Sequence, residues 1–174
     1  MTITTLFSGS SDFYMSQTPL TKLTQAHSAG LRTFEGTASD AFDLAASLNA
    51  EGKHTLIARV VRGTKSRSMR ELFDELAAAW QFPPYFGENW NAVDECLDDM
   101  DWLPCDHYVM VITDAHLLLK DEKADALRVF VDVLEELKAG PKKAPFRTVF
   151  QTDASHRAAF HARLTTAGAK PEPL

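Results

Sequence analysis

The residues whose side chains could bind a partner or take part in chemistry are concentrated in one short stretch, between Phe82 and Leu97. An aromatic segment there leads into a predicted helix whose side chains divide into two faces. At about 100° per residue, the apolar arc holds Trp90, Val93, Cys96, Leu97 and Met100. The roughly opposite arc holds Asn91, Asp94, Glu95 and Asp98. Carboxylates gathered on one helix face favour binding of a cationic partner.

The acidic residues of this helix cost local stability. Asp94, Glu95 and Asp98 lie in the middle of the helix or later, where the helix dipole does not favour negative charge. Like charges at i and i+4 also repel by a few tenths of a kcal/mol. Interspersed lysines would give solubility without this cost, so the placement suggests a function. The alternative is a simple solvated helix face.

Charge is distributed unevenly along the whole chain. Between Glu71 and Leu119 there are eleven acidic residues and no Lys or Arg, although the net charge of the chain is only −6. Nucleic-acid phosphates would be repelled by this window. We therefore expect no direct binding of nucleic acid and favour a basic protein as the partner.

The other candidate metal and redox residues have simpler interpretations. Cys96 lies on the apolar arc and is expected to be buried, and the spacing of Cys96, Cys105 and His107 matches no standard zinc pattern. The acids at 98, 99 and 101 point apart on a helix, and no EF-hand loop is present. We expect no metal and no cofactor.

No catalytic motif is visible. The sequence lacks GxSxG, P-loop and GxGxxG patterns. His156 and His161 are five residues apart on a predicted helix, on different faces, and are expected at the surface. We therefore expect a protein that is not an enzyme. A small hydrolase that uses its carboxylates as acid and base is the open alternative.

The elements that position these residues alternate between strand and helix. A chain of 174 residues with 45% hydrophobic and 24% charged residues is typical of one soluble domain. Strands are predicted at 31–35, 54–61, 108–113 and 146–150. A first helix is predicted from a cap at Ser39-Asp40 to near Gly52, and a second from a capping box at Ser68 and Glu71 to Pro83. A third helix is predicted from Asn89 to Asp101, and a fourth from Asp121 to Lys138 with a stop at Gly140-Pro141. The last is predicted from a cap at Asp153 to Thr165.

This alternation predicts an α/β fold with a small parallel sheet packed by helices. The expected division is a poorly ordered arm over residues 1–27, one domain over 28–168 with its core at 54–150, and a tail over 169–174. The three tryptophans are expected to anchor the core, and they are Trp80, Trp90 and Trp102. Tyr85, in contrast, is expected at the surface. Gly87 provides a position where φ can be positive or a partner can approach closely.

Sequence features also indicate the compartment. The first twenty residues show no basic segment followed by an apolar stretch, and two cysteines make no disulfide framework. We expect a cytoplasmic protein without a signal peptide or membrane span. An exposed acidic face also favours a monomer when the protein is free.

The segment Phe82-Pro-x-Tyr-Phe-Gly-x-Asn-x-x-Ala-x-x-x-Cys-Leu resembles the loop and second helix of the barstar family, whose type member is the intracellular inhibitor of the ribonuclease barnase. The order of elements from His54 to Phe150 also agrees with that family. The resemblance implies a three-stranded parallel sheet packed by helices, with an added N-terminal strand as an open alternative. Residues outside this range resemble longer members of the family.

The resemblance also implies which residues bind the partner. Tyr85, Gly87, Asn89, Asn91, Asp94 and Glu95 occupy positions that meet the ribonuclease active site in barstar. Glu95 replaces the aspartate that enters the phosphate pocket, Asn91 replaces another interfacial aspartate, and Asp94 replaces a tryptophan. With the neighbours on the same loop and helix, the predicted binding set is Tyr85, Phe86, Gly87, Glu88, Asn89, Asn91, Asp94, Glu95 and Asp98.

The function implied is that of an immunity-type inhibitor. It would block the cationic active site of a basic, barnase-type ribonuclease, either secreted or a toxin, with an acidic helix and an aromatic loop. The three differences at the site fit a nuclease whose basic cleft differs from that of barnase. The alternative is a regulatory or scaffolding module of the same fold that binds another basic protein.

Overall fold

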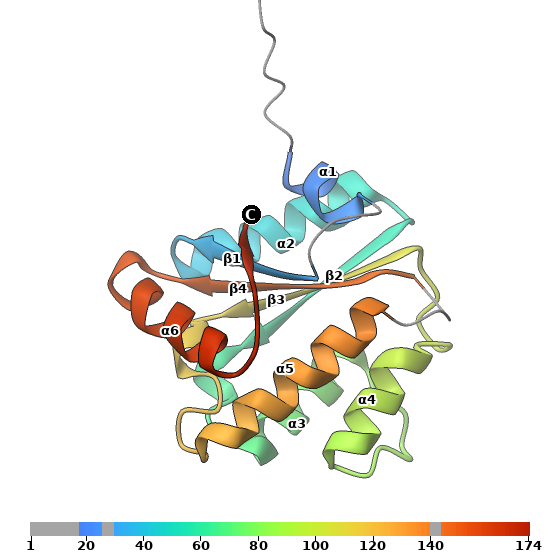
Figure 1. Cartoon of the computed structure of the whole chain (residues 1–174). Coiled ribbons are helices and arrows are strands. Elements are labelled where there is room, and N and C mark those ends of the chain that lie inside the picture. Colours follow the sequence, from blue (N-terminus) through green and yellow to red (C-terminus); the bar gives the residue numbers. More distant parts are fainter. Residues whose placement is uncertain (1–17, 26–29, 140–143) are drawn as a thin grey trace, which may run out of the picture.

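A five-stranded parallel sheet forms the centre of the molecule, with the strand order β2-β3-β4-β1-β5 (Figure 1). The computed structural model describes residues 18–25, 30–139 and 144–174. The strands are β1 (Leu31–Glu35), β2 (Leu56–Arg62), β3 (His107–Thr113), β4 (Phe146–Thr152) and β5 (Glu172–Pro173). The predicted α/β fold with a parallel sheet is confirmed, and the added N-terminal strand is β1, which pairs with β4.

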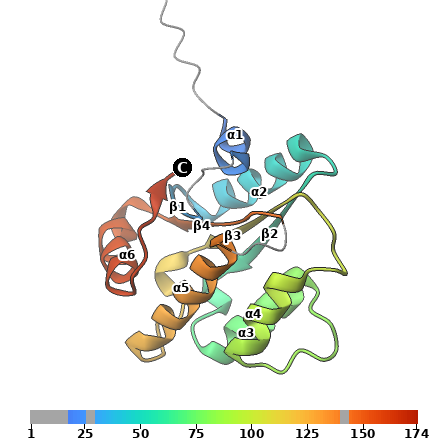
Figure 2. The ribbon, with the colours of Figure 1, turned by 45° about the vertical axis from the view of Figure 1, so that its right-hand side comes forward.

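Helices cover both faces of the sheet (Figures 1 and 2). One face carries α1 (Pro19–Thr24) and α2 (Ala38–Gly52), and the other carries α3 (Met69–Trp80), α4 (Trp90–Asp99), α5 (Ala124–Ala139) and α6 (Ala154–Thr166). In β3, Val109 and Val111 face α2 whereas Met110 and Ile112 face α3 and α5. Because both faces are buried, the strand reads as a continuous apolar run. Among the described helices, none is long and apolar enough to cross a membrane.

Side-chain hydrogen bonds cap the starts of α2, α3 and α6. Ser68 and Glu71 form the predicted capping box of α3, and Asp153 caps α6. The predicted start of α2 is wrong by two residues. Its cap is Thr37, whose hydroxyl oxygen accepts from the Asp40 N–H, while the Asp40 carboxylate accepts from the Thr37 N–H. Phe42, expected on the apolar side of this helix, is 47% exposed.

Two other helix boundaries differ from the prediction. The helix predicted from Asp121 begins at Ala124, because Asp121 and Glu122 bind groups on another loop. The helix α3 ends at Trp80, before the two prolines, and the capping residue Gln81 adopts a left-handed conformation with φ of 54°. The predicted stop at Gly140-Pro141 lies outside the described residues.

The two ends of the chain contain more regular structure than the sequence predicted. Residues 1–17 of the expected arm lie outside the described residues, but the next residues form α1, and Leu23 is buried beside α2. The expected tail forms the edge strand β5, where the Leu174 N–H donates to the Thr33 carbonyl at 2.9 Å. Ala169 is also buried. Both segments therefore pack on the domain.

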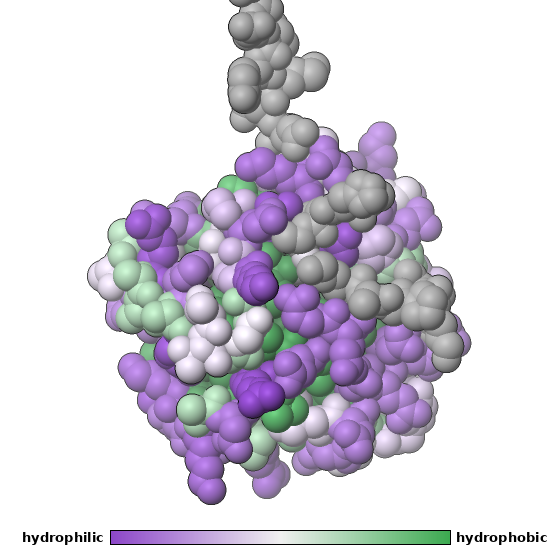
Figure 3. Space-filling view, viewed as in Figure 1, coloured by the Kyte–Doolittle hydropathy of each residue, from purple (hydrophilic) through white to green (hydrophobic). Residues whose placement is uncertain are grey.

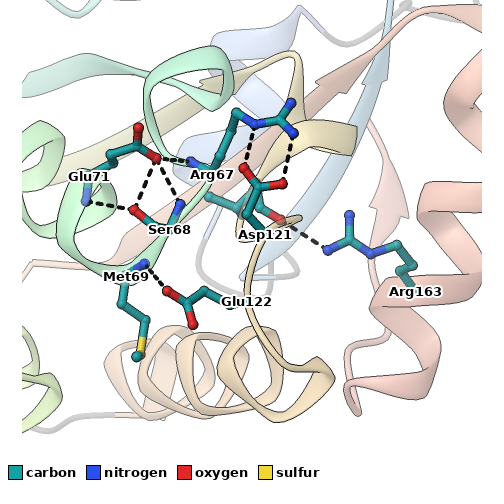
Figure 4. A network of polar contacts seen from close by, with 8 residues as sticks. Arg67, Ser68, Met69, Glu71, Asp121, Glu122 and Arg163 are labelled. Atoms are coloured by element: carbon teal, nitrogen blue, oxygen red, sulfur yellow. Dashed lines mark hydrogen bonds and ion pairs between the residues drawn. The ribbon is translucent and has the colours of Figure 1, made fainter.

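The loop after β2 and the loop after β3 are joined by a network of polar contacts (Figure 4). The Arg67 guanidinium makes two 2.7 Å hydrogen bonds to the Asp121 carboxylate, and the Asp121 N–H donates to the Arg67 carbonyl. The Met69 N–H at the start of α3 donates to Glu122 at 3.0 Å. This network fixes the start of α3 against the segment that leads into α5.

Gly63 allows the same two loops to approach closely. A Cβ atom at this position would lie 2.4 Å from the Asp114 carbonyl oxygen and 2.5 Å from the Thr113 carbonyl oxygen. Both neighbours are backbone, so they cannot move aside without shifting the end of β3. Glycine is therefore required at position 63 because there is no room for a Cβ atom, and not because of its φ angle.

We expect Gly63→Ala to lower the free energy of unfolding by about 1–3 kcal/mol, the usual cost of overpacking. Thr64→Ala, at the exposed neighbouring position, is the control and should change it by less than about 0.5 kcal/mol. Urea unfolding followed by circular dichroism measures both. Equal stability of Gly63→Ala and the wild type would contradict this interpretation.

Candidate functional site

A chain of aromatic contacts fixes the predicted binding loop and α4 on the domain. The Phe73 ring of α3 makes edge-to-face contacts with Trp90, at a centroid distance of 5.0 Å, and with Phe86, at 6.3 Å. Phe86 in turn contacts Phe82 at 4.9 Å, and Trp90 contacts Phe130 of α5 at 5.9 Å. Such pairs add about 0.5–1.5 kcal/mol each to ordinary burial. The loop and the start of α4 are thus held by both α3 and α5.

The turn into α4 is closed by one asparagine. The Asn89 side-chain oxygen accepts from the Ala92 N–H at 3.0 Å, which confirms Asn89 as the N-cap, and its amide donates to the Gly87 carbonyl at 3.0 Å. The positive φ of the turn lies at Glu88, with 48°, rather than at Gly87. A Cβ at Gly87 would lie 3.0 Å from the Asn89 amide nitrogen. This glycine therefore serves the close approach of Asn89.

Tyr85 is the most exposed large hydrophobic side chain of the described residues, with 67% of its surface accessible. Partial desolvation and then the nearby Asp99 carboxylate raise the pKa of its phenol, with a smaller effect from Glu95. These causes place Tyr85 beside the acids at one side of α4. Its neighbour Phe86 is partly buried in the aromatic chain, so Tyr85 is the ring that the loop presents to a partner.

The acidic face of α4 is divided between two environments. Glu95 is exposed on the side of Tyr85, whereas Asp94 and Asp98 are partly buried. Desolvation, followed by the charges of Glu136 and Asp98, raises the pKa of the Asp94 carboxyl. Glu136 belongs to α5, which packs beside α4 (Figure 2). Negative charge therefore continues from α4 onto α5 at Glu136.

The nine predicted residues all lie on the aromatic loop or on α4. The exposed members are Tyr85, Gly87, Glu88, Asn89, Asn91 and Glu95, and the partly buried ones are Phe86, Asp94 and Asp98. We refer to these nine residues as the acidic surface.

Three acids near this surface were missing from the predicted set. Asp99 and Asp101 act on the Tyr85 phenol, and Glu136 acts on Asp94. Helical spacing places Asp99 one turn after Glu95, so the sequence contained that signal. Glu136 belongs to another helix, and only the packing of α5 on α4 brings it near.

The other residues that the sequence analysis singled out lie outside the acidic surface. Trp80 is fully buried, and the Trp102 indole N–H donates to its carbonyl at 3.0 Å. Cys96 is buried as expected, and Cys105 is partly buried. His161 is exposed as expected. Within the described parts of the chain, no three His, Cys, Asp or Glu residues are grouped so that they could hold a metal ion.

Two solved structures align with this chain at low sequence identity. The Aeropyrum pernix ORC2 protein in its ADP form aligns with a TM-score of 0.60 and 11% identity, over 82% of this chain and 40% of that chain. A chain of Drosophila ORC bound to GC-rich DNA and Cdc6 aligns with a TM-score of 0.45 and 14% identity, over 83% of this chain and 49% of that one. This chain therefore spans less than half the length of either protein. The first likeness concerns the fold alone. No curated protein matches the sequence significantly.

A family model gives the identification. The model described as Barstar (barnase inhibitor) matches residues 56–151, from the first residue of β2 to the last but one of β4. This range covers more than half of the chain and includes the aromatic loop and all of α4. The order of its elements is the one described above. The chain therefore belongs to the barstar family, the family of the barnase inhibitor.

Proposed function

We propose that the protein is an intracellular inhibitor of a basic ribonuclease and acts by covering the active site of the enzyme. The observation that carries this proposal is the acidic surface with Tyr85 at its edge, built on a barstar-family domain. The cytoplasm is the compartment in which such an inhibitor would protect its own cell. On this proposal the protein performs no catalysis itself.

The chemistry of a ribonuclease cleft complements this surface. Such a cleft binds RNA phosphates through cationic side chains, and carboxylates can occupy the phosphate positions. Glu95 has the exposure to enter the cleft, and Tyr85 can cover a base or ribose position. Opposite charge also accelerates encounter, to as much as ~10⁸–10⁹ M⁻¹s⁻¹ at low salt. Speed matters for an inhibitor that must act before RNA is cut.

The surface is organised for binding at the expense of stability. The negative charge of Asp94 is disfavoured in the free protein by desolvation and by Glu136 and Asp98. Because folding raises the pKa of this carboxyl, the ionised form destabilises the fold as pH rises through its titration, and the penalty is absent once the group is protonated. A cationic partner would remove the penalty on binding.

We expect Asp94→Asn to raise the free energy of unfolding at pH 7 by about 0.3–0.5 kcal/mol, the typical size of a like-charge helix contact. The gain should disappear near pH 3, where the aspartate is protonated. Asp43→Asn, at an exposed position on α2, is the control. Urea unfolding at both pH values measures the effect, and a stabilisation that persists at pH 3 would show that charge is not its cause.

We expect Glu95→Lys to weaken binding of the cognate nuclease by at least ~2 kcal/mol, about thirtyfold in Kd, because a desolvated carboxylate in an interface is a typical hot spot. Glu51→Lys makes the same charge change on α2, across the sheet, and should alter Kd less than about threefold. Titration calorimetry measures Kd, and thermal unfolding checks that both variants fold. Equal Kd values for Glu95→Lys and wild type would show that Glu95 does not contribute to the interface.

Affinity capture from the source cells tests the function as a whole. Immobilised wild-type protein is compared with the double variant Asp94→Lys/Glu95→Lys, and proteins released by high salt are assayed for cleavage of RNA. We expect a basic ribonuclease only from the wild type, and one equivalent of free protein should abolish its activity. Capture of a basic protein without ribonuclease activity would instead support a regulatory or scaffolding role.

A further inference from the structure

An open pocket lies between α5 and α6, away from the acidic surface. Its volume is about 710 Å³, within the range of pockets that hold small molecules. Its walls are the loop before α5, the first turns of α5 and one side of α6. Four buried apolar side chains lie at its floor, and they are Leu119, Leu127, Phe160 and Ala167. Figure 3 shows hydrophobic residues between hydrophilic ones on this side of the molecule.

The rim of this pocket is mainly basic. It carries Lys120, Lys123, Arg128 and Arg163, against the acids Glu122 and Asp125. The Glu122 carboxylate accepts the Met69 N–H at 3.0 Å and is thereby directed to α3 (Figure 4). The Arg128 guanidinium lies 3.9 Å from the Asp132 carboxylate, a long distance for an ion pair. The pocket therefore has an excess of positive charge in a protein that is acidic overall.

Arg163 lacks a counter-ion within the described parts of the chain. Its guanidinium donates to the His116 carbonyl at 2.9 Å and to the Leu118 carbonyl at 3.0 Å, and no described carboxylate lies within ion-pair distance. Burial lowers the pKa of this side chain, which shows that its charge is partly desolvated. A partly desolvated cation without a counter-ion is stabilised by a bound anion.

Two stacked histidines form a flat part of the wall. The His116 and His156 rings are parallel within 7°, with centroids 3.8 Å apart. His156 is held by Asp153 at 2.9 Å, and the buried His116 Nδ1 has no hydrogen-bond partner among the residues that the structure describes. The stack adds an aromatic surface next to the apolar floor, so an apolar group has contacts on two sides.

We propose that this pocket binds a small amphipathic anion, with its carboxylate or similar head group near Arg163 and Lys123 and its apolar body on the floor. The basic rim selects the negative head group, and the floor accounts for the apolar body. The volume fits a ligand of small-molecule size. This proposal is independent of the proposed function, because the acidic surface would repel such an anion.

The test uses the full chain and decanoate as the probe, below its micelle concentration. Titration calorimetry should show one saturable site, and decanol and decyltrimethylammonium should bind at least about tenfold more weakly, a difference of ~1.4 kcal/mol. Amide NMR shifts should lie in α5, α6 and the loop between β3 and α5. No saturable binding, equal binding of decanol, or shifts confined to α4 would each overturn the proposal.

Ala162 and Lys123 are exposed, so we expect substitutions at these two positions to leave the fold intact. Ala162→Trp places a large ring in the pocket from α6 and should weaken decanoate binding at least about tenfold. Lys123→Glu should weaken it at least about fivefold, because it reverses a charge on the rim. Lys53→Glu makes the same change at the end of α2 and should leave Kd within about twofold. An equal loss with Lys53→Glu, or none with Ala162→Trp, would contradict the site.

Discussion

The contact of Trp90 with Phe73 on one side and Phe130 on the other is the interaction on which the acidic surface depends. The helix α4 is only ten residues long and carries acids that repel one another, so it would be marginal in isolation. Its apolar side, with Val93 and Leu97 buried in the core, supplies the stability that the acids remove. The tertiary packing thus allows a sequence that is unfavourable for a helix to present negative charge in a fixed arrangement.

The protein separates its charges between two regions, with α5 between them. Near one end of this helix, Glu136 extends the acidic surface of α4, and at the other end Arg128 lies on the rim of the basic pocket. The separation reflects the sequence window from Glu71 to Leu119, which contains no Lys or Arg. A cationic protein and a small anion would therefore be attracted to different sides of one domain.

The family match ends inside the sheet, so the full domain is larger than the matched segment. Residues 56–151 supply β2, β3 and most of β4, whereas β1, β5, α2 and α6 lie outside them. Among these added elements, α2 packs on one face of the sheet and α6 on the other, and β1 and β5 extend the sheet beyond β4. The basic pocket depends on α6, which lies beyond the matched segment. The acidic surface, in contrast, lies wholly within the matched segment 56–151.

The sequence alone determined the parallel α/β class, the caps Asn89, Ser68 and Asp153, and the exposure of Tyr85, because these depend on local patterns such as helical spacing and capping residues. It did not predict the late start of α5, where Asp121 binds Arg67, or the approach of Glu136 to Asp94. The sequence also did not predict the stacking of His116 on His156 or the strand β5. Each joins residues far apart in the chain, and only the tertiary structure decides which distant residues meet.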